Sequence, residues 1–233
     1  MSFQMSTLHP HSKPSIISSA MNIPLPQIPA DLTKPDDIMN LFNNEEDLVE
    51  LLLENQVGTS AQTEKISIAH CSIIKSDLSF MNMEKFDIAN SEIKNTNLSG
   101  SKFPNSSWRT VAVDGSRCSG LELQDSLLKN IRFSNSKLDI VNFRFAQIEN
   151  MVFENCILDD ADFYGATIKN VDFINCTISK ITFANAKMKN VNLSKSTIEA
   201  IDGVESLRGS ILSYDQLIQL APYFAAEAGI KIS

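Results

Sequence analysis

The sequence predicts an all-β solenoid, and two spacings carry this prediction. Between residues 66 and 202 an apolar or near-apolar residue recurs at every fifth position without a break, from Ile68 to Ile198. Two positions before most of these residues lies a second, usually small one, such as Ser126 or Ala161. The inward positions are thus two and three residues apart in alternation, which fits neither a helix of period about 3.6 nor a plain strand. Short strands joined by tight turns and wound around a narrow core do fit.

A slower pattern predicts the number of sides. Between residues 131 and 183, Phe stands at the centre of every second pentapeptide, and Leu or Ile stands between. Since like residues must lie above one another to form ladders, the coil needs an even number of sides, and four sides give a 20-residue coil. The predicted core ladders are Phe133, Phe153 and Phe173, and Phe143, Phe163 and Phe183. Asn130, Asn150, Asn170 and Asn190 are then expected at one corner.

These residues resemble the pentapeptide-repeat proteins, whose repeat has a small residue, a polar residue, a central Leu or Phe and two free positions. Segments such as Ala161-Asp162-Phe163 carry the pattern, and the resemblance covers 27 consecutive repeats. It implies a right-handed quadrilateral β-helix, a hand that general crossover chirality also favours. About seven coils are expected.

The chain is predicted to have four parts. Residues 1–32 hold five of the eight prolines and are expected to be a disordered or loosely docked tail. Residues 33–65 should form an N-terminal helix and cap that starts near Thr33, and 66–202 the β-helix. Residues 203–233 should be a linker and a helix capped by Ser213, with Pro222 kinking or dividing it.

Composition favours a non-enzymatic protein. No Ser/His/Asp grouping, glycine-rich phosphate loop or metal-ligand spacing is present, so no catalytic residue, cofactor or metal is expected. Cys71, Cys118, Cys156 and Cys176 occupy inward positions and are expected to be free thiols. No stretch reaches the roughly 18 apolar residues of a membrane span, so a cytoplasmic protein without membrane contact is expected.

Two surfaces are candidate interaction sites. An acidic group comprises Glu154, Asp159, Asp160, Asp162 and Asp172, which should wrap around the coil rather than form one stripe. The C-terminal helix has apolar residues on more than one face, which predicts a homodimer interface. Its expected contact residues are Leu217, Leu220, Tyr223 and Phe224.

The leading functional hypothesis is a rigid protein-interaction module with an unknown protein partner. The alternative, implied by the family resemblance, is imitation of duplex DNA to occupy DNA gyrase or topoisomerase and protect it from quinolones. The net charge of −8 invites this alternative, but residues 66–202 hold 16 acidic and 15 basic residues. Duplex DNA carries one charge per roughly 1.7 Å, so such a balanced solenoid is a poor mimic, and direct nucleic-acid binding is not expected.

Overall fold

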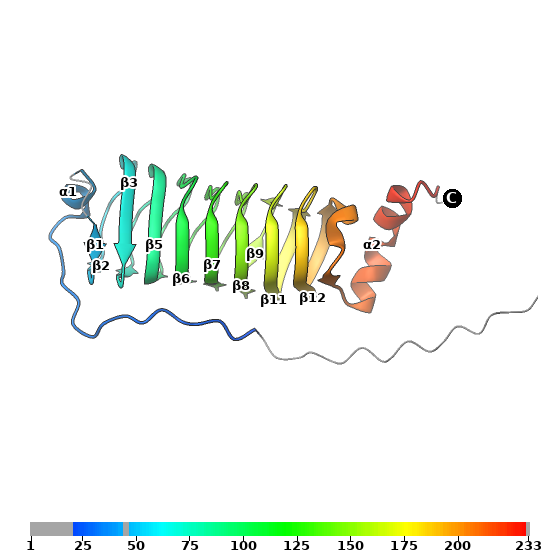
Figure 1. The fold of residues 1–233 in the computed structure, drawn as a ribbon, viewed down its shortest axis with the longest axis horizontal. Helices are drawn as coiled ribbons and strands as arrows, with labels where there is room; N and C mark the ends of the chain where they lie inside the picture. The colour runs from blue at the N-terminus through cyan, green and yellow to red at the C-terminus, as the bar shows by residue number, and fades with distance from the viewer. Residues whose placement is uncertain (1–20, 44–46, 232–233) are drawn as a thin grey trace, which may run out of the picture.

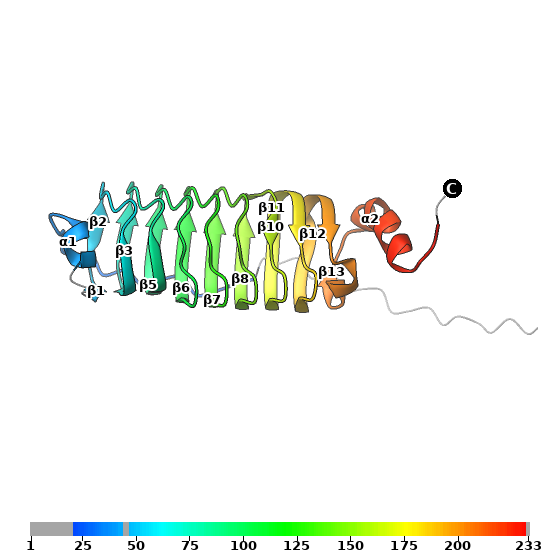
Figure 2. The same cartoon turned by 90° about the horizontal axis from the view of Figure 1, so that it is seen from above.

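The computed structural model describes residues 21–43 and 47–231, which form a parallel β-solenoid of about eight coils. The coils stack along one axis, with a short helix at one end and a longer helix at the other (Figures 1 and 2). The expected fold class is confirmed.

Strands of successive coils pair in parallel at an offset of 20 residues, for example Phe133 opposite Phe153 and Phe173 opposite Phe153. The longer strands are β3 (Gln62–Ala69), β5 (Asn82–Lys94), β6 (Ser107–Asp114), β7 (Leu127–Ser134), β8 (Gln147–Glu154), β11 (Thr167–Thr182) and β12 (Lys187–Asp202). The shorter strands are β1 (Leu48–Val49), β2 (Leu52–Glu54), β4 (Ser72–Ile74), β9 (Ile157–Leu158), β10 (Ala161–Asp162) and β13 (Ser210–Ile211).

Each coil has four faces, which we name after one central residue. The Leu128 face also contains Ile148, and the Phe133 face contains Phe153; the Leu138 and Phe143 faces complete the coil. All four naming residues are buried.

The predicted aromatic ladders form the middle of the core. The Phe153 ring stacks on Phe133 and Phe173, with centroid distances of 5.5 and 4.8 Å. On the opposite face, the Phe143 and Phe163 rings stack at 4.8 Å, and Phe163 and Phe183 are tilted at 5.4 Å. All six rings are buried.

The small inward residues do more than save space. The Ser126 hydroxyl accepts a hydrogen bond from the Ser106 backbone N–H at 3.0 Å, and Ser136 does the same for Ser116 at 3.1 Å. The Ser126 hydroxyl in turn donates to the Phe103 carbonyl at 3.3 Å. These bonds pair polar groups of the backbone that would otherwise be buried without partners.

The solenoid begins earlier than expected, at Leu48 rather than at residue 66. Strand β1 pairs with β3, and β2 pairs with β4. The N-terminal helix and cap predicted over residues 33–65 differ in extent from the structure, because the helix α1 spans only Ile38–Asn43 and the strands begin at Leu48. Thr33 does not cap it but forms a bridge with Leu51.

Helix α1 closes the N-terminal end of the core. Ile38 and Phe42 are buried, and a Cβ at Gly58 would lie 3.1 Å from the Phe42 ring. The helix thus places an aromatic side chain where the first coil lacks a large central residue.

The C-terminal helix α2 (Tyr214–Glu227) closes the other end. It starts at the predicted cap, where Ser213 and Gln216 form a capping box, and Pro222 lies inside the helix without ending it. The Gln216 amide also donates to the Leu193 and Ser196 carbonyls at 2.8 and 2.7 Å. It thus provides hydrogen-bond donors for two backbone carbonyls at the end of the last coil. The 3-10 helix η1 (Val204–Leu207) connects β12 to this cap.

Residues 21–32, the described part of the predicted tail, run along the outside of the solenoid (Figure 1). The expectation for residues 1–20 lies outside the described residues.

No described helix has the length and apolar character needed to cross a membrane.

Candidate functional site

The corners between faces are built from residues with left-handed backbone. Most of these positions hold Asn or Gly, such as Asn130, Asn150 and Gly165, with φ between 57° and 66°. Asn and Gly adopt this conformation more readily than other residues. Two positions of the pentapeptide follow no residue pattern in the sequence. One of these two is the corner, where the backbone must be left-handed.

Three corners violate this preference with large apolar side chains. Phe80, Ile140 and Phe145 have φ values of 57°, 54° and 57°, and their exposed fractions are 64%, 66% and 51%. A bulky or β-branched residue with left-handed backbone is an outlier that costs about 1–2 kcal/mol. Exposed outliers of this kind concentrate at functional sites, so these corners mark the candidate surface.

Two of the three lie at the opposite ends of the Phe143 face in one coil. We call the surface between them the Phe143-face patch. It comprises Ile140, Asn142, Arg144, Phe145, Asp162 and Tyr164.

Arg144 lies at the centre of this patch. Its guanidinium lies 4.3 Å from the Tyr164 ring centroid and 5.7 Å from that of Phe145. It also forms an ion pair with Asp162 at 2.9 Å. The Phe145 and Tyr164 rings meet edge to face at 5.6 Å. Stacking and the ion pair hold Arg144 in place, so little conformational entropy would be lost on binding.

Gly165 supports the Phe145 ring. A Cβ at Gly165 would lie 2.6 Å from the Phe145 ring, which shows that the ring lies over this glycine. At the other end of the patch, Ile140, Asn142 and Asp162 line a hollow of about 410 Å³. The patch thus combines a supported aromatic ring with a neighbouring recess.

We expect Ile140→Asn to raise the free energy of unfolding by about 1 kcal/mol, because Asn relieves the backbone strain and little buried area is lost. The matched control is Ile157→Asn, since Ile157 is also half-exposed but lies in strand β9. That change should be neutral or destabilising. Urea unfolding of both variants measures the difference. A lower free energy of unfolding for Ile140→Asn would contradict the inference that the backbone at Ile140 is strained.

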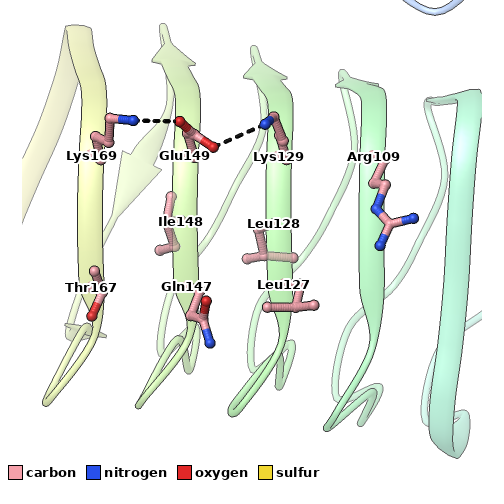
Figure 3. Close-up of a pocket in the computed structure, with 9 residues that line it drawn as sticks. All are labelled: Arg109, Leu127, Leu128, Lys129, Gln147, Ile148, Glu149, Thr167 and Lys169. Carbon is pink, nitrogen blue, oxygen red and sulfur yellow. Dashed lines mark hydrogen bonds and ion pairs between the residues drawn. The ribbon is translucent and has the colours of Figure 1, made fainter.

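A second hollow, of about 330 Å³, lies on the Leu128 face. Figure 3 shows Lys129 and Lys169 directed at Glu149 from either side, with ion-pair distances of 3.0 and 2.7 Å. Hydrogen bonds from Lys169 and Lys129 lower the pKa of Glu149. Arg109 lies on the next coil without an ion pair among the described residues. Most of the charged side chains that line this hollow are therefore paired with a charge of opposite sign.

The predicted acidic residues do not form one surface. Glu154 and Asp172 lie on the Phe133 face, Asp159 on the Leu138 face and Asp162 on the Phe143 face, whereas Asp160 lies at the corner between the last two.

Each of them also has a partner. Arg132 pairs with Glu154 at 2.9 Å, Lys180 with Asp160 at 2.8 Å and Arg144 with Asp162 at 2.9 Å. The hydrogen bond to Asp160 raises the pKa of Lys180. Asp159 accepts a hydrogen bond from Ser179, and Asp172 accepts one from the Met21 N–H at 2.9 Å.

Two of the predicted dimer residues pack against the core, and two are exposed. Leu220 is fully buried and Phe224 is partly buried against the core, whereas Leu217 and Tyr223 are exposed. Tyr214 and Ile218, which the prediction did not include, are also exposed.

Within residues 21–43 and 47–231, no three His, Cys, Asp or Glu side chains lie together as metal ligands. The four cysteines are buried free thiols, as expected, and burial raises the pKa of Cys118 to about 12. A thiol with so high a pKa is a poor nucleophile.

Comparisons with solved structures give several pentapeptide-repeat proteins. One is a trypsin-treated form of QnrB1, described as a plasmid-mediated fluoroquinolone resistance protein, with 15% identity, a TM-score of 0.35 and coverage of 81% of this chain and 92% of that chain. Another is HetL from the cyanobacterium Nostoc, involved in heterocyst differentiation regulation, with 13% identity, a TM-score of 0.24 and coverage of 77% and 97%. No match was found among the curated proteins.

A family model matches about a third of the sequence. Residues 126–202 match the model described as "Pentapeptide repeat region". The matched stretch runs from β7 to the end of β12, where both aromatic ladders lie. This part of the chain therefore matches a pentapeptide repeat region.

Proposed function

We propose that the protein is a non-enzymatic, rigid interaction module that binds a protein partner through the Phe143-face patch. The observation that carries this proposal is the pair of exposed, strained apolar residues Ile140 and Phe145 at the two ends of one face. Tyr, Phe and Arg are enriched at protein interfaces, and Tyr and Arg dominate their energetic centres. Arg144 and Tyr164 lie between the two apolar residues as such a centre would require.

Free thiols support a reducing compartment, so we propose that the protein acts in the cytoplasm.

The test is capture of a partner from the source cell with three full-length baits. Wild type should enrich a protein that the double variant Ile140→Asn, Phe145→Asn does not enrich, because both apolar anchors are lost. Phe80→Asn is the matched control, since Phe80 is an equally exposed corner residue outside the patch. Quantitative mass spectrometry reads the result. Equal enrichment by all three baits would contradict the proposal.

The DNA-mimic alternative receives less support from the charge distribution. A mimic must present a continuous acidic field, but the acidic residues lie on three faces and Glu154, Asp160 and Asp162 are neutralised by cations. A gyrase-type target is therefore the second candidate.

We also propose that α2 joins two copies of the chain. Tyr223 is exposed, but nine positions after Tyr214 it lies on another side of the helix. Tyr214, Leu217 and Ile218 are exposed and three or four positions apart, so they form one stripe. This uncharged stripe can meet its own copy across a two-fold axis without like-charge repulsion. Leu220 and Gln216 remain with the solenoid, so the cap and the dimer contact use different sides of one helix.

The double variant Leu217→Lys, Ile218→Lys should be a monomer, because two cations on each copy would face one another in a dimer. Light scattering should give 25.8 kDa for the variant and twice that mass for wild type. Gln216 and Leu220 are unchanged, so the cap should persist. A wild-type protein that is monomeric at micromolar concentration would contradict the dimer.

A further inference from the structure

Residues 21–32 lie against the solenoid as an extended strap. At one end, the Met21 N–H donates to the Asp172 carboxylate at 2.9 Å. Farther along, the Gln27 carbonyl lies 3.3 Å from His70 Nδ1. From residue 21 to residue 32 the strap runs along the coils toward α1, opposite to the direction in which the solenoid grows (Figure 1).

The reach of the strap shows that it is close to fully extended. Asp172 and His70 are about five coils apart, which is roughly 24 Å at the usual strand spacing. Six residue steps from Met21 to Gln27 span about 20 Å at roughly 3.1–3.4 Å per residue. The two side chains bridge the remainder. The prolines of the strap favour this extended backbone and lower the entropy lost on docking.

The strap occupies a groove along the corner between the Leu128 and Phe133 faces. We call this the lateral groove. Asn150 and Asn170 line it together with Met21 to Pro24 of the strap, around a space of about 490 Å³. The corner itself is an amide ladder, in which Asn150 donates to Asn130 and Asn170 to Asn150, both at 3.0 Å.

Burial on this side shows that the groove has an apolar component. Val152 points outward between the inward Met151 and Phe153, yet its exposed fraction is 0%. Val152 lies next to Asp172 of the following coil, the residue that bonds the Met21 N–H, so it lies close to the strap. Ile23 of the strap has an exposed fraction of 4%, whereas Leu25 two residues later is 63% exposed. The Ile23 side chain is therefore buried against the solenoid, whereas the Leu25 side chain is exposed to solvent.

The strap is held by few bonds. Hydrogen bonds at Met21 and Gln27 are those recorded between residues 21–32 and the coils, and Ile23 is the large apolar residue of this segment that is buried. Segments with so few contacts open at a small fraction of the global free energy of unfolding. Such a segment can open while the paired coils stay folded.

We propose that the lateral groove is a peptide-binding site, with the strap as its intramolecular ligand. It would accept from another protein an extended segment with an aliphatic residue followed by proline, and with a free backbone N–H placed for Asp172. A carboxylate at that end would be excluded, because it would face the carboxylate of Asp172. This inference rests on the proposed interaction role but uses a surface apart from the Phe143-face patch.

The probe is a fluorescein-labelled peptide with the sequence of residues 21–32, MNIPLPQIPADL. A full-length variant in which these residues are replaced by a Gly-Ser sequence of equal length leaves the groove empty. Fluorescence anisotropy should show binding to this variant with a Kd on the order of 100 µM. Wild type should bind at least about tenfold more weakly, because a tethered strap competes at an effective concentration of about 1 mM.

Three matched changes make the test specific. A peptide with Asp in place of Ile23 should not bind the strap-replaced variant. Val152→Lys in that variant should abolish binding of the unchanged peptide, whereas Lys189→Ala, a change of an exposed residue on the Leu128 face, should not alter it. Should the Gly-Ser replacement fold poorly by circular dichroism, full-length Ile23→Asp serves as the strap-released protein.

Equal affinity of wild type and the strap-released protein, or equal binding of both peptides, would overturn the proposal. The assay needs only the purified chain and a peptide. A negative result in this assay would therefore not contradict partner binding through the Phe143-face patch. A negative result in the capture experiment would likewise not contradict the peptide-binding groove.

Discussion

Replacing Phe153 with alanine is expected to lower the free energy of unfolding by about 3–5 kcal/mol. The ring is fully buried and stacks on the rings above and below it, Phe133 and Phe173. It also meets Phe143 and Phe163 edge to face at 6.2 and 6.3 Å. Its removal takes away four aromatic contacts and leaves a cavity that paired strands on every side cannot collapse to fill.

Urea unfolding followed by far-UV circular dichroism measures the loss. The control is Lys189→Ala, because Lys189 is exposed and has no recorded ion pair in the described part of the chain. It should change the free energy of unfolding by less than about 0.5 kcal/mol. Similar effects of the two substitutions would mean that the inward register is wrong.

The coil could be predicted because its ladders repeat in the sequence. Phe153 lies between two phenylalanines at a separation of 20 residues, and Asn150 lies between Asn130 and Asn170 in the same way. Parallel pairing places each residue directly over its equivalent, so chemical identity at a fixed separation reports a contact in space. Few folds translate sequence into contacts so directly.

The start of the solenoid could not be predicted because its first coil lacks the apolar signal. Gly58 and Thr63 stand at central positions where the later coils have large apolar residues. Leu48 and Leu53 fit the five-residue repeat, but Leu48 and Leu52 are four residues apart and fit a helix equally well. Only the structure shows that Phe42 from α1 fills the space beside Gly58, so the missing residue is supplied from outside the repeat.

The candidate site was missed for a different reason. The sequence pattern leaves the corner positions free, so Ile140 and Phe145 appear as ordinary variation. Their meaning depends on the left-handed backbone, which makes Asn or Gly the unstrained choice. The run of Asn at other corners was the available signal, since it marks the positions where an isoleucine or phenylalanine is anomalous.

The acidic group was expected to wrap around the coil, and its members do lie on different faces. Glu154 and Asp159 are five residues apart in the chain, but the corner at Asn155 separates them. Glu154 pairs with Arg132, whereas Asp159 accepts a hydrogen bond from Ser179. Neighbours in a solenoid are residues 20 apart, not residues close in sequence.

Gly203→Ala is expected to lower the free energy of unfolding by about 3 kcal/mol. Gly203 follows the last residue of β12 and has φ of 84°. A Cβ at this position would lie 2.2 Å from the Ala184 nitrogen and 2.4 Å from its Cα. These are backbone atoms of a coil whose strands are paired, so the overlap can be relieved only by moving the chain that leads to η1 and α2. The left-handed backbone adds about 1–2 kcal/mol, and the overlap adds a similar amount.

Gly120→Ala separates these two contributions. Gly120 has φ of 70°, but a Cβ there would have no neighbour nearer than 3.8 Å. Its substitution should therefore lower the free energy of unfolding by only about 1 kcal/mol, from backbone strain alone. Urea unfolding of both variants gives the difference, which isolates the steric overlap at Gly203. Equal losses would mean that the chain after β12 can shift freely, and then Gln216 and Leu220 would not hold α2 against the last coil as tightly as their burial indicates.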